Sequence, residues 1–457
     1  MKKYEIDMCN GPLLGKIISF AVPLILSNFL QLFFNAADIM VAGRFAGTEA
    51  LAAVGATSSV INLMINLFIG LSIGVNVLAA RYFATHDRKS MQDLVHTTFP
   101  FAVIGGFLLV VIGFIIAEPI MASMDTPPEV IDHAALYLKI YCCGMPVSLL
   151  YNFGNAVLRA VGDTKRPLYY LAISGVVNVV LNIFFVTQFH MGVAGVALAT
   201  VISQVLSAAL LMRSIMKTDS MYKFNIKKIS IKKRTVVQVV SIGLPAGIQS
   251  CLFSLSNILI QSSINYFGAT AMAGSTAANN IENFVYMAMN ALNNTTLSFV
   301  SQNFGAGKYN RIKRVLLMCL GLVFGVGFIL GSLGVMFGET LLGIFATDAE
   351  AIAAGMVKLR YVCGLYFLCG IMEVLAGGVR GLGASIMPTI VSLLGACGLR
   401  IVWIFTVFEW HKTLEVLYQS YSVSWSVTAI AHAVCLVFIY RKQKKYHMAL
   451  TKEKQSV

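Results

Sequence analysis

Charged side chains are scarce in this 457-residue chain. Asp, Glu, Lys and Arg together make up 12% of it, whereas soluble globular domains carry about 25%. Hydrophobic residues account for 58%, and the mean hydropathy is +0.78. A chain this apolar cannot have water as its only solvent, which argues against an ordinary soluble enzyme or binding module.

The sequence also lacks the motifs of several common function classes. Its nine cysteines are scattered, and neither Cys142-Cys143 nor the Cys363/Cys369 spacing matches a metal or redox pattern. No glycine-rich phosphate loop follows a strand pattern, and no Ser/His/Asp grouping is found. We therefore expect neither an enzyme nor an ATP-driven pump, with no catalytic residues and no cofactor.

Acidic residues are fewer than basic ones, 20 against 34, which gives a formal net charge of +14. The basic residues lie between apolar stretches rather than in one domain. That distribution is typical of loops beside membrane spans, which meet anionic lipid, and argues against nucleic acid as a partner.

Twelve segments are long and apolar enough to cross a membrane as helices, which takes about 20 residues each. They predict an all-α polytopic membrane protein, with spans near residues 17–42, 52–79, 95–117, 134–157, 167–187, 192–214, 236–266, 277–300, 314–337, 353–378, 388–408 and 417–440.

Lysine and arginine predict the orientation of these spans. Most of the 34 fall near the termini, in the 215–235 segment and in the loops on that same side, beginning with Lys2 and Lys3. The opposite loops are acidic or neutral and include Glu118 and Asp125. By the positive-inside rule, both termini and the 215–235 linker are expected in the cytoplasm.

The two halves of the chain repeat each other. Arg159–Pro167 and Arg380–Pro388 share Arg, Gly and Pro at matching positions, and Pro23 corresponds to Pro245 under nearly the same shift. Internal duplication in an apolar chain is typical of transporters. It predicts two pseudo-symmetric six-helix bundles: an N-terminal lobe (1–214), a basic linker (215–235), a C-terminal lobe (236–440) and a basic tail (441–457).

Polar residues inside the N-terminal spans share one depth. Asp38 lies on one helix face with Gln31 and Asn35, and a carboxylate in hydrocarbon costs at least about 2.5 kcal/mol. The other polar side chains at this depth are Asn178, Asn182 and Thr200. Such oxygen ligands suit Na⁺ or a proton on Asp38, while hydrogen bonding between helices is the alternative for the amides.

The C-terminal spans carry different charges, since Ile260 stands at the position equivalent to Asp38. Arg400 is expected near the bilayer midplane, where an unpaired guanidinium is implausible. We expect Glu373, on the preceding span, to neutralise it. Both a structural pair and a substrate-facing role remain open, and Glu282 lies near the outer end of its span.

These residues give the chain a family resemblance over essentially its full length. It resembles the multidrug and toxic compound extrusion (MATE) transporters, in the bacterial branch of DNA-damage-inducible F-like (DinF-like) proteins. The similarity rests on Pro23 and on Asp38–Gly43, Gly195–Thr200, Gln302–Gly307 and the repeated Arg-x-x-Gly-x-x-x-x-Pro.

The resemblance implies a two-lobed antiporter of the bacterial cytoplasmic membrane. It would export amphipathic, often cationic compounds in exchange for H⁺ or Na⁺ by alternating access, as a monomer with small molecules and membrane lipids as partners. The implied cation or proton site, and possible Na⁺ site, comprises Asp38, Asn178, Asn182 and Thr200. Candidate substrate-path residues are Gln31, Asn35, Asn155, Glu282, Glu373 and Arg400.

Two departures from the family pattern affect this expectation. Relatives of this branch often carry Asp where this chain has Asn182, so one titratable group remains here instead of two. Span seven also lacks the acid that another branch uses as a cation ligand.

The alternative function is a flippase of lipid-linked oligosaccharides or peptidoglycan precursors from the same superfamily. Such flippases often have two extra spans and a strongly cationic cavity, whereas Arg400 is the only cation expected inside. A channel or receptor would not predict duplicated bundles.

Overall fold

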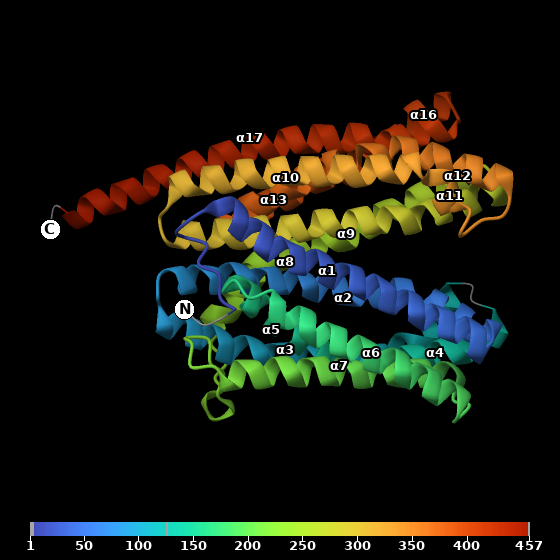
Figure 1. The fold of residues 1–457 in the computed structure, drawn as a ribbon, viewed down its shortest axis with the longest axis horizontal. Helices are drawn as coiled ribbons and strands as arrows, with labels where there is room; N and C mark the ends of the chain where they lie inside the picture. The colour runs from blue at the N-terminus through green and yellow to red at the C-terminus, as the bar shows by residue number, and fades with distance from the viewer. Residues whose placement is uncertain (1–3, 125–126, 456–457) are drawn as a thin grey trace. The chain divides into compact units, whose positions relative to one another are not determined.

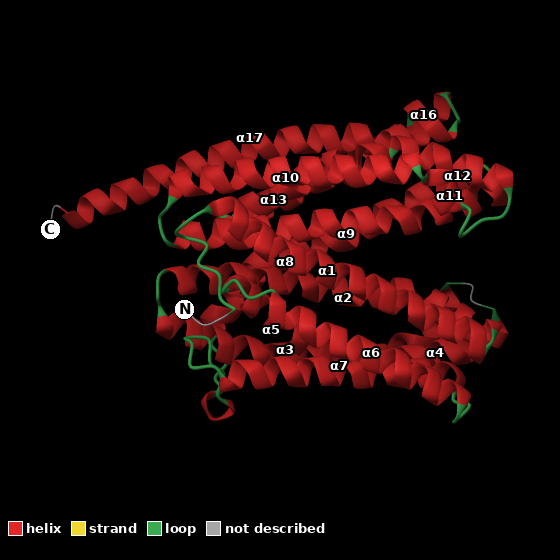
Figure 2. Cartoon of the chain, viewed as in Figure 1, coloured by secondary structure: helices red, strands yellow, loops and turns green. Residues whose placement is uncertain are grey.

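The computed structural model describes residues 4–124 and 127–455, and within these ranges it contains helices and loops but no strand (Figure 2). Lys2, Lys3 and Asp125, which contributed to the orientation argument, lie outside the described residues. The predicted all-α class is confirmed.

The helices follow the predicted spans in order and exceed most of them by several residues. In the N-terminal half they are α1 (Leu13–Val41), the π-helical η1 (Ala42–Ala46), α2 (Thr48–Ala84), α3 (Arg88–Ser123), α4 (Pro128–Cys143), α5 (Met145–Ala160), α6 (Lys165–Thr187), α7 (Gly192–Lys217) and the 3₁₀ turn η2 (Ile226–Lys228). The rest are α8 (Lys233–Asn265), α9 (Ala269–Gly305), α10 (Tyr309–Met336), α11 (Gly338–Leu342), α12 (Ala349–Tyr361), η3 (Cys363–Leu365), α13 (Tyr366–Gly381), α14 (Ile386–Ser392), the π-helical η4 (Leu393–Gly398), α15 (Leu399–Phe405), α16 (Val407–Trp410) and α17 (Leu414–Gln455).

Ten helical segments of the described chain are long and apolar enough to cross a membrane, and α4 with α5, bent by 48°, makes an eleventh. The remaining predicted span is α9. It has 37 residues, more than the ~20 that a span requires. It is more polar than the others, with side chains such as Asn279, Asn290 and Asn293 on it, and many of its polar residues are buried.

Contacts divide the chain into two compact units. Unit 1 contains Val22–Gly247 and the N-terminal residues up to Asp7; unit 2 contains Met8–Ala21 and the chain from Ile248 onward. Both helical boundaries fall beside a proline inside a helix, Pro23 in α1 and Pro245 in α8. A proline inside a helix removes one backbone hydrogen bond. Each of these two helices therefore contributes residues to both units.

Unit 1 depends on close approaches between glycines. A Cβ added to Gly70 of α2 would lie 2.2 Å from the backbone nitrogen of Gly247 in α8. Only glycine permits this backbone contact, which is the usual way in which membrane helices pack tightly. Elsewhere in the unit, α6 and α7 run side by side as an antiparallel pair (Figure 1).

Unit 2 is built around α9, which packs against α10, α12 and α13. The chain segment before α1 is attached to it, because Asn303 Nδ2 and Arg311 Nε both donate to the carbonyl oxygen of Met8, at 3.1 and 3.0 Å. Phe20 stacks edge-on against Phe299 with ring centroids 5.6 Å apart. The first turns of α1 are thereby fixed to the polar helix α9.

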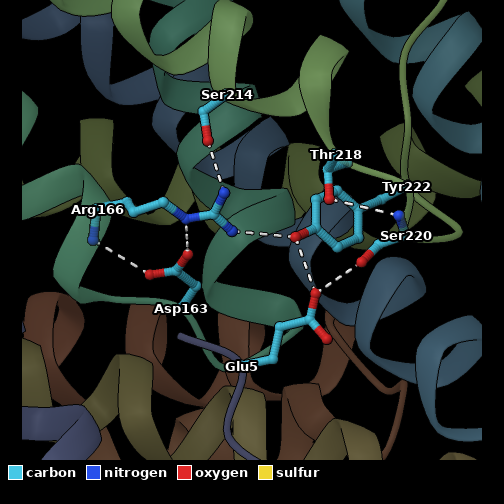
Figure 3. Close-up of polar contacts among 7 residues, drawn as sticks. All are labelled: Glu5, Asp163, Arg166, Ser214, Thr218, Ser220 and Tyr222. Carbon is cyan, nitrogen blue, oxygen red and sulfur yellow. Dashed lines mark hydrogen bonds and ion pairs between the residues drawn. The ribbon is translucent and has the colours of Figure 1, made fainter. Parts of the chain in front are cut away.

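A buried polar cluster in unit 1 joins the N-terminal segment to the linker between α7 and α8 (Figure 3). Arg166 forms an ion pair with Asp163 and donates to Tyr222 Oη at 3.0 Å. Tyr222 in turn donates to Glu5 Oε1 at 3.1 Å. Burial raises the pKa of Tyr222, so the phenol stays protonated and can accept and donate at once.

The rest of the linker is also attached to unit 1. Gln92 Nε2 donates to the Met221 carbonyl at 2.6 Å, the Asn225 backbone N–H donates to His96 Nε2 at 3.0 Å, and Lys232 forms a 2.6 Å ion pair with Asp93. Although the linker is basic and polar, side chains of α3 and α6 hold it to unit 1 at several points.

The second repeat provides a natural test of the Asp163–Arg166 pair, because it has Ala384 and Met387 at the matching positions. Asp163 is fully buried, and removing one partner of a buried pair costs roughly 3–5 kcal/mol. Arg166→Met should therefore lower the free energy of unfolding of the purified protein by about that amount. The double variant Asp163→Ala/Arg166→Met should recover most of the loss, and Lys165→Met, at an exposed neighbour, should change little. Equal losses in the single and double variants would contradict the assignment.

Candidate ion-binding site

The predicted polar residues of the N-terminal half come from three helices of unit 1. Asp38 lies in the last turn of α1, just before the π-helical turn η1. Asn178 and Asn182 lie one turn apart on α6, and Thr200 lies on α7. Asn178 and Asn182 are almost completely buried, and Asp38 and Thr200 are half-buried.

A glycine brings α1 and α6 together at this point. A Cβ on Gly175 would lie 1.8 Å from the Phe34 ring, so no other residue fits there without moving the phenylalanine. Asp38 is one turn after Phe34 and Asn178 one turn after Gly175. The close contact between Phe34 and Gly175 therefore places the carboxylate beside the amides.

Hydrogen bonds connect all four side chains. Asn182 Nδ2 donates to Asp38 Oδ1 and also lies 3.3 Å from Asn178 Oδ1. Asn178 Nδ2 donates to Thr200 Oγ1 at 3.4 Å, and Thr200 Oγ1 lies 3.4 Å from Asp38 Oδ2 and 3.0 Å from its own helical acceptor, the Val196 carbonyl. Both carboxylate oxygens thus face polar hydrogens, but no basic side chain forms an ion pair with Asp38 among the described residues.

The cluster has one acceptor that is left unsatisfied. Asn182 Oδ1 is buried and has no hydrogen-bond partner in the described part of the chain. A buried acceptor without a partner is costly. A cation bound beside this oxygen would remove that cost. A proton on Asp38 would remove it only if the Asn182 amide rotated so that its Oδ1 faced the carboxyl group. The described residues contain no group of three or more His, Cys, Asp or Glu side chains that could hold a metal ion.

Two tyrosines of α4 near this cluster were missed in the sequence. Tyr137 and Tyr141 stack with ring centroids 6.1 Å apart and are close enough to interact with the Asp38 charge. Their spacing of one helical turn could have suggested a shared face. The candidate site was predicted from polar residues within the spans, and tyrosines were not counted among them.

Three other candidates do not join the cluster. Gln31 and Asn35 are exposed, and Asn155 is half-buried on α5 with its Oδ1 lacking a partner among the described residues. Among the described residues, no hydrogen bond connects any of them to Asp38. Their place on the substrate path stays a prediction.

The charged residues of unit 2 do not pair as expected. Asn293 Nδ2 donates to Glu373 Oε2 at 3.0 Å, and Arg380, two turns later on α13, is close enough to interact with the Glu373 charge. Glu282, for which no partner was predicted, forms an ion pair with Lys358, whose Nζ lies 3.8 Å from Glu282 Oε2. Sequence analysis overlooked Lys358, because it lies in the first turns of a span where a lysine can be assigned to the loop.

The predicted neutralisation of Arg400 by Glu373 is wrong. Arg400 Nε donates to Ser424 Oγ at 3.0 Å, and its guanidinium lies 4.2 Å from the ring centroid of Tyr421. The π-helical turn η4 directly before α15 inserts an extra residue into the helix and changes the side that Arg400 faces. An aromatic ring of α17 therefore takes the place of the acid.

Many apolar helices in series, two compact units and a half-buried carboxylate that has no basic partner among the described residues are together typical of a polytopic membrane transporter. The MatE family model matches this chain twice, over residues 23–184 and 245–406. The chain belongs to the MATE family of transporters. The two matches begin at Pro23 and Pro245, so they coincide with the internal repeat.

Relatives of known name cover nearly the whole chain. "Probable multidrug resistance protein YoeA" of Bacillus subtilis is 30% identical over 95% of this chain and 94% of its own length. "Probable multidrug resistance protein NorM" of Thermotoga maritima is 25% identical over 87% and 86%. "Multidrug export protein MepA" of Staphylococcus aureus is 21% identical over 93% and 92%.

Solved structures confirm the fold. The chain described as "Crystal structure of MATE in complex with MaL6" has a TM-score of 0.90 at 19% identity and covers 97% of this chain and all of its own. "Outward-facing conformation of a multidrug resistance MATE family transporter of the MOP superfamily" matches equally well, with TM-score 0.90, 19% identity and the same coverage.

The separation of Glu373 and Arg400 can be tested by double-mutant cycles on thermal unfolding. Glu373→Gln and Arg400→Gln should act independently, with a coupling energy below about 0.5 kcal/mol. Arg400→Gln and Tyr421→Leu should be coupled by about 0.5–2 kcal/mol, the range of a cation–π contact. Strong coupling in the first cycle and none in the second would restore the pair expected from the sequence.

Proposed function

We propose that this chain is a secondary active exporter of amphipathic, often cationic organic compounds, which it exchanges for H⁺ or Na⁺ by alternating access. The observation that carries the proposal is the Asp38 cluster. A single carboxylate in a membrane helix, surrounded by two amides and a hydroxyl and lacking a basic partner among the described residues, suits a reversibly bound monovalent cation.

The physical basis is the cost of a bare carboxylate in a low-dielectric environment. When Asp38 is ionised, Asn182 and Thr200 offset part of its charge by hydrogen bonding. When H⁺ or Na⁺ binds, the net charge disappears and burial becomes cheaper. A conformational equilibrium shifts only if the ion binds the two states with different affinity. A site whose burial changes between states meets this requirement.

Asn182 gives the site one titratable group instead of two. An amide cannot take up a proton, but its oxygen can ligate a cation and its N–H₂ can donate to Asp38. We propose that Asn182 holds the carboxylate in place and that one monovalent ion is exchanged here per cycle.

The named relatives support efflux as the direction of transport, since they are described as multidrug resistance or export proteins. The basic loops support a bacterial cytoplasmic-membrane location with both termini in the cytoplasm. Unit 2 gives no support to the flippase alternative, which would call for a strongly cationic cavity. Besides Arg400, its buried cations Lys358 and Arg380 each have a polar partner, Glu282 and Gln249 respectively.

Transport by Asp38→Asn tests the proposal directly. In proteoliposomes, uptake of a fluorescent lipophilic cation driven by an H⁺ or Na⁺ gradient should fall at least tenfold, because the amide binds neither ion as a neutralising ligand. Applying each gradient alone identifies the coupling ion. Glu118→Gln, the same carboxylate-to-amide change at an exposed position outside the cluster, is the matched control and should retain transport. Wild-type rates from well-folded Asp38→Asn protein would refute the proposed coupling role.

A further inference from the structure

Unit 2 contains a buried ammonium group that the proposed transport cycle does not use. Lys358 of α12 is 2% exposed. Its surroundings are contributed by α9 and α17. A lysine this deeply buried in a membrane protein needs a specific set of partners.

Two glycines bring the lysine against α9. A Cβ on Gly274 would lie 2.2 Å from the Ala351 carbonyl oxygen, and one on Gly355 would lie 2.9 Å from the Gly274 carbonyl oxygen. Lys358 follows Gly355 by one turn. It therefore lies over the face of α9 that begins directly after Gly274.

That face presents oxygen atoms at helical spacing. Ser275, Asn279 and Glu282 stand at i, i+4 and i+7 on α9. Lys358 Nζ lies 3.3 Å from Ser275 Oγ and 3.5 Å from the Ser275 carbonyl oxygen, and it donates to Asn279 Oδ1. The Tyr418 ring centroid lies 5.8 Å away on another side.

Glu282 is attracted to this ammonium without being hydrogen bonded to it. Its Oε2 is 3.8 Å from Lys358 Nζ, beyond hydrogen-bond distance. Its Oε1 is buried and has no partner in the described part of the chain. The three oxygen atoms within hydrogen-bond distance of the ammonium are neutral, so the Glu282 carboxylate compensates its charge without a hydrogen bond.

This arrangement fits a spherical charge better than a directional donor. An alkali cation has no hydrogens to aim, so it can contact serine, amide and carboxylate oxygens together. The ammonium is a compact charge on a long stem and can occupy the same place. Because it is covalently attached, it cannot leave.

We propose that Ser275, Asn279 and Glu282 form an oxygen-lined site for a monovalent alkali cation, and that the Lys358 ammonium occupies it as a tethered substitute. Unit 2 then exchanges no ion of its own. The statement that unit 2 exchanges no ion depends on the proposed antiport function, whereas the existence of the latent site does not. Lys358 would thus be the residue that restricts ion exchange to the Asp38 cluster.

Removal of the ammonium should open the site. The test uses the purified full chain carrying Asp38→Asn, which removes the carboxylate of the proposed ion site in unit 1. This parent protein is compared with the same protein carrying Lys358→Met. Both are measured in NaCl, KCl or choline chloride at equal ionic strength. The readouts are the thermal unfolding midpoint and binding of radiolabelled Na⁺. Lys358→Met should gain about one Na⁺ per molecule and a midpoint several degrees higher in NaCl or KCl than in choline chloride. The parent with Lys358 should show neither.

The double variant Lys358→Met/Glu282→Gln keeps the volume but removes the anionic ligand, so it should fold without alkali dependence. Lys358→Met that folds only in NaCl or KCl would also support the site. The proposal is overturned if folded Lys358→Met binds no Na⁺, or if it stays unfolded in every salt while the double variant folds. It is equally overturned if the parent already binds Na⁺ in a Glu282-dependent manner. Because these readouts involve no transport, they are independent of whether Asp38 couples export to an ion.

Discussion

The cost of placing a charge in hydrocarbon is the constraint on which the rest of this structure depends. Lipid cannot solvate an ionised group, so every buried charge needs a partner from another helix. The helices must therefore approach closely wherever such a group is found. Gly175 against Phe34 does this at Asp38, and Gly274 against the α12 backbone does it at Lys358.

Three different solutions to this constraint occur in the two units. Asp38 is surrounded by neutral amides and a hydroxyl, which leave its charge uncompensated. Arg400 lies over an aromatic ring, and Lys358 is paired with Glu282. Only the first arrangement leaves a net negative charge, which a mobile cation could neutralise. The difference between the units in this respect explains why two similar repeats need not perform the same task.

Much of the fold could be predicted from the sequence, because hydrophobic length and repeated motifs are local signals. The depth of Asp38, Asn178 and Asn182 followed from counting residues along straight helices, and the structure places these side chains in contact. The Arg400 partner could not be found in this way, since the π-helical turn η4 alters the direction of the side chain.

Two further features depended on tertiary contacts that the sequence does not display. The basic linker reads as flexible, yet the burial of Tyr222 and its bond to Arg166 fix part of it. Helix α9 reads as an ordinary span, but its polar residues are satisfied by contacts such as that between Asn293 and Glu373. Neither contact has a signature in residue spacing.

Ion release on substrate binding tests the central claim most directly. Saturating tetraphenylphosphonium would be added to detergent-purified protein in weak buffer, with released H⁺ followed by an indicator dye and released Na⁺ by an ion-selective electrode. If Asp38 holds the coupling ion, wild-type protein should release about one ion per molecule and Asp38→Asn none, while both still bind the probe. Equal release from the two proteins would contradict the account.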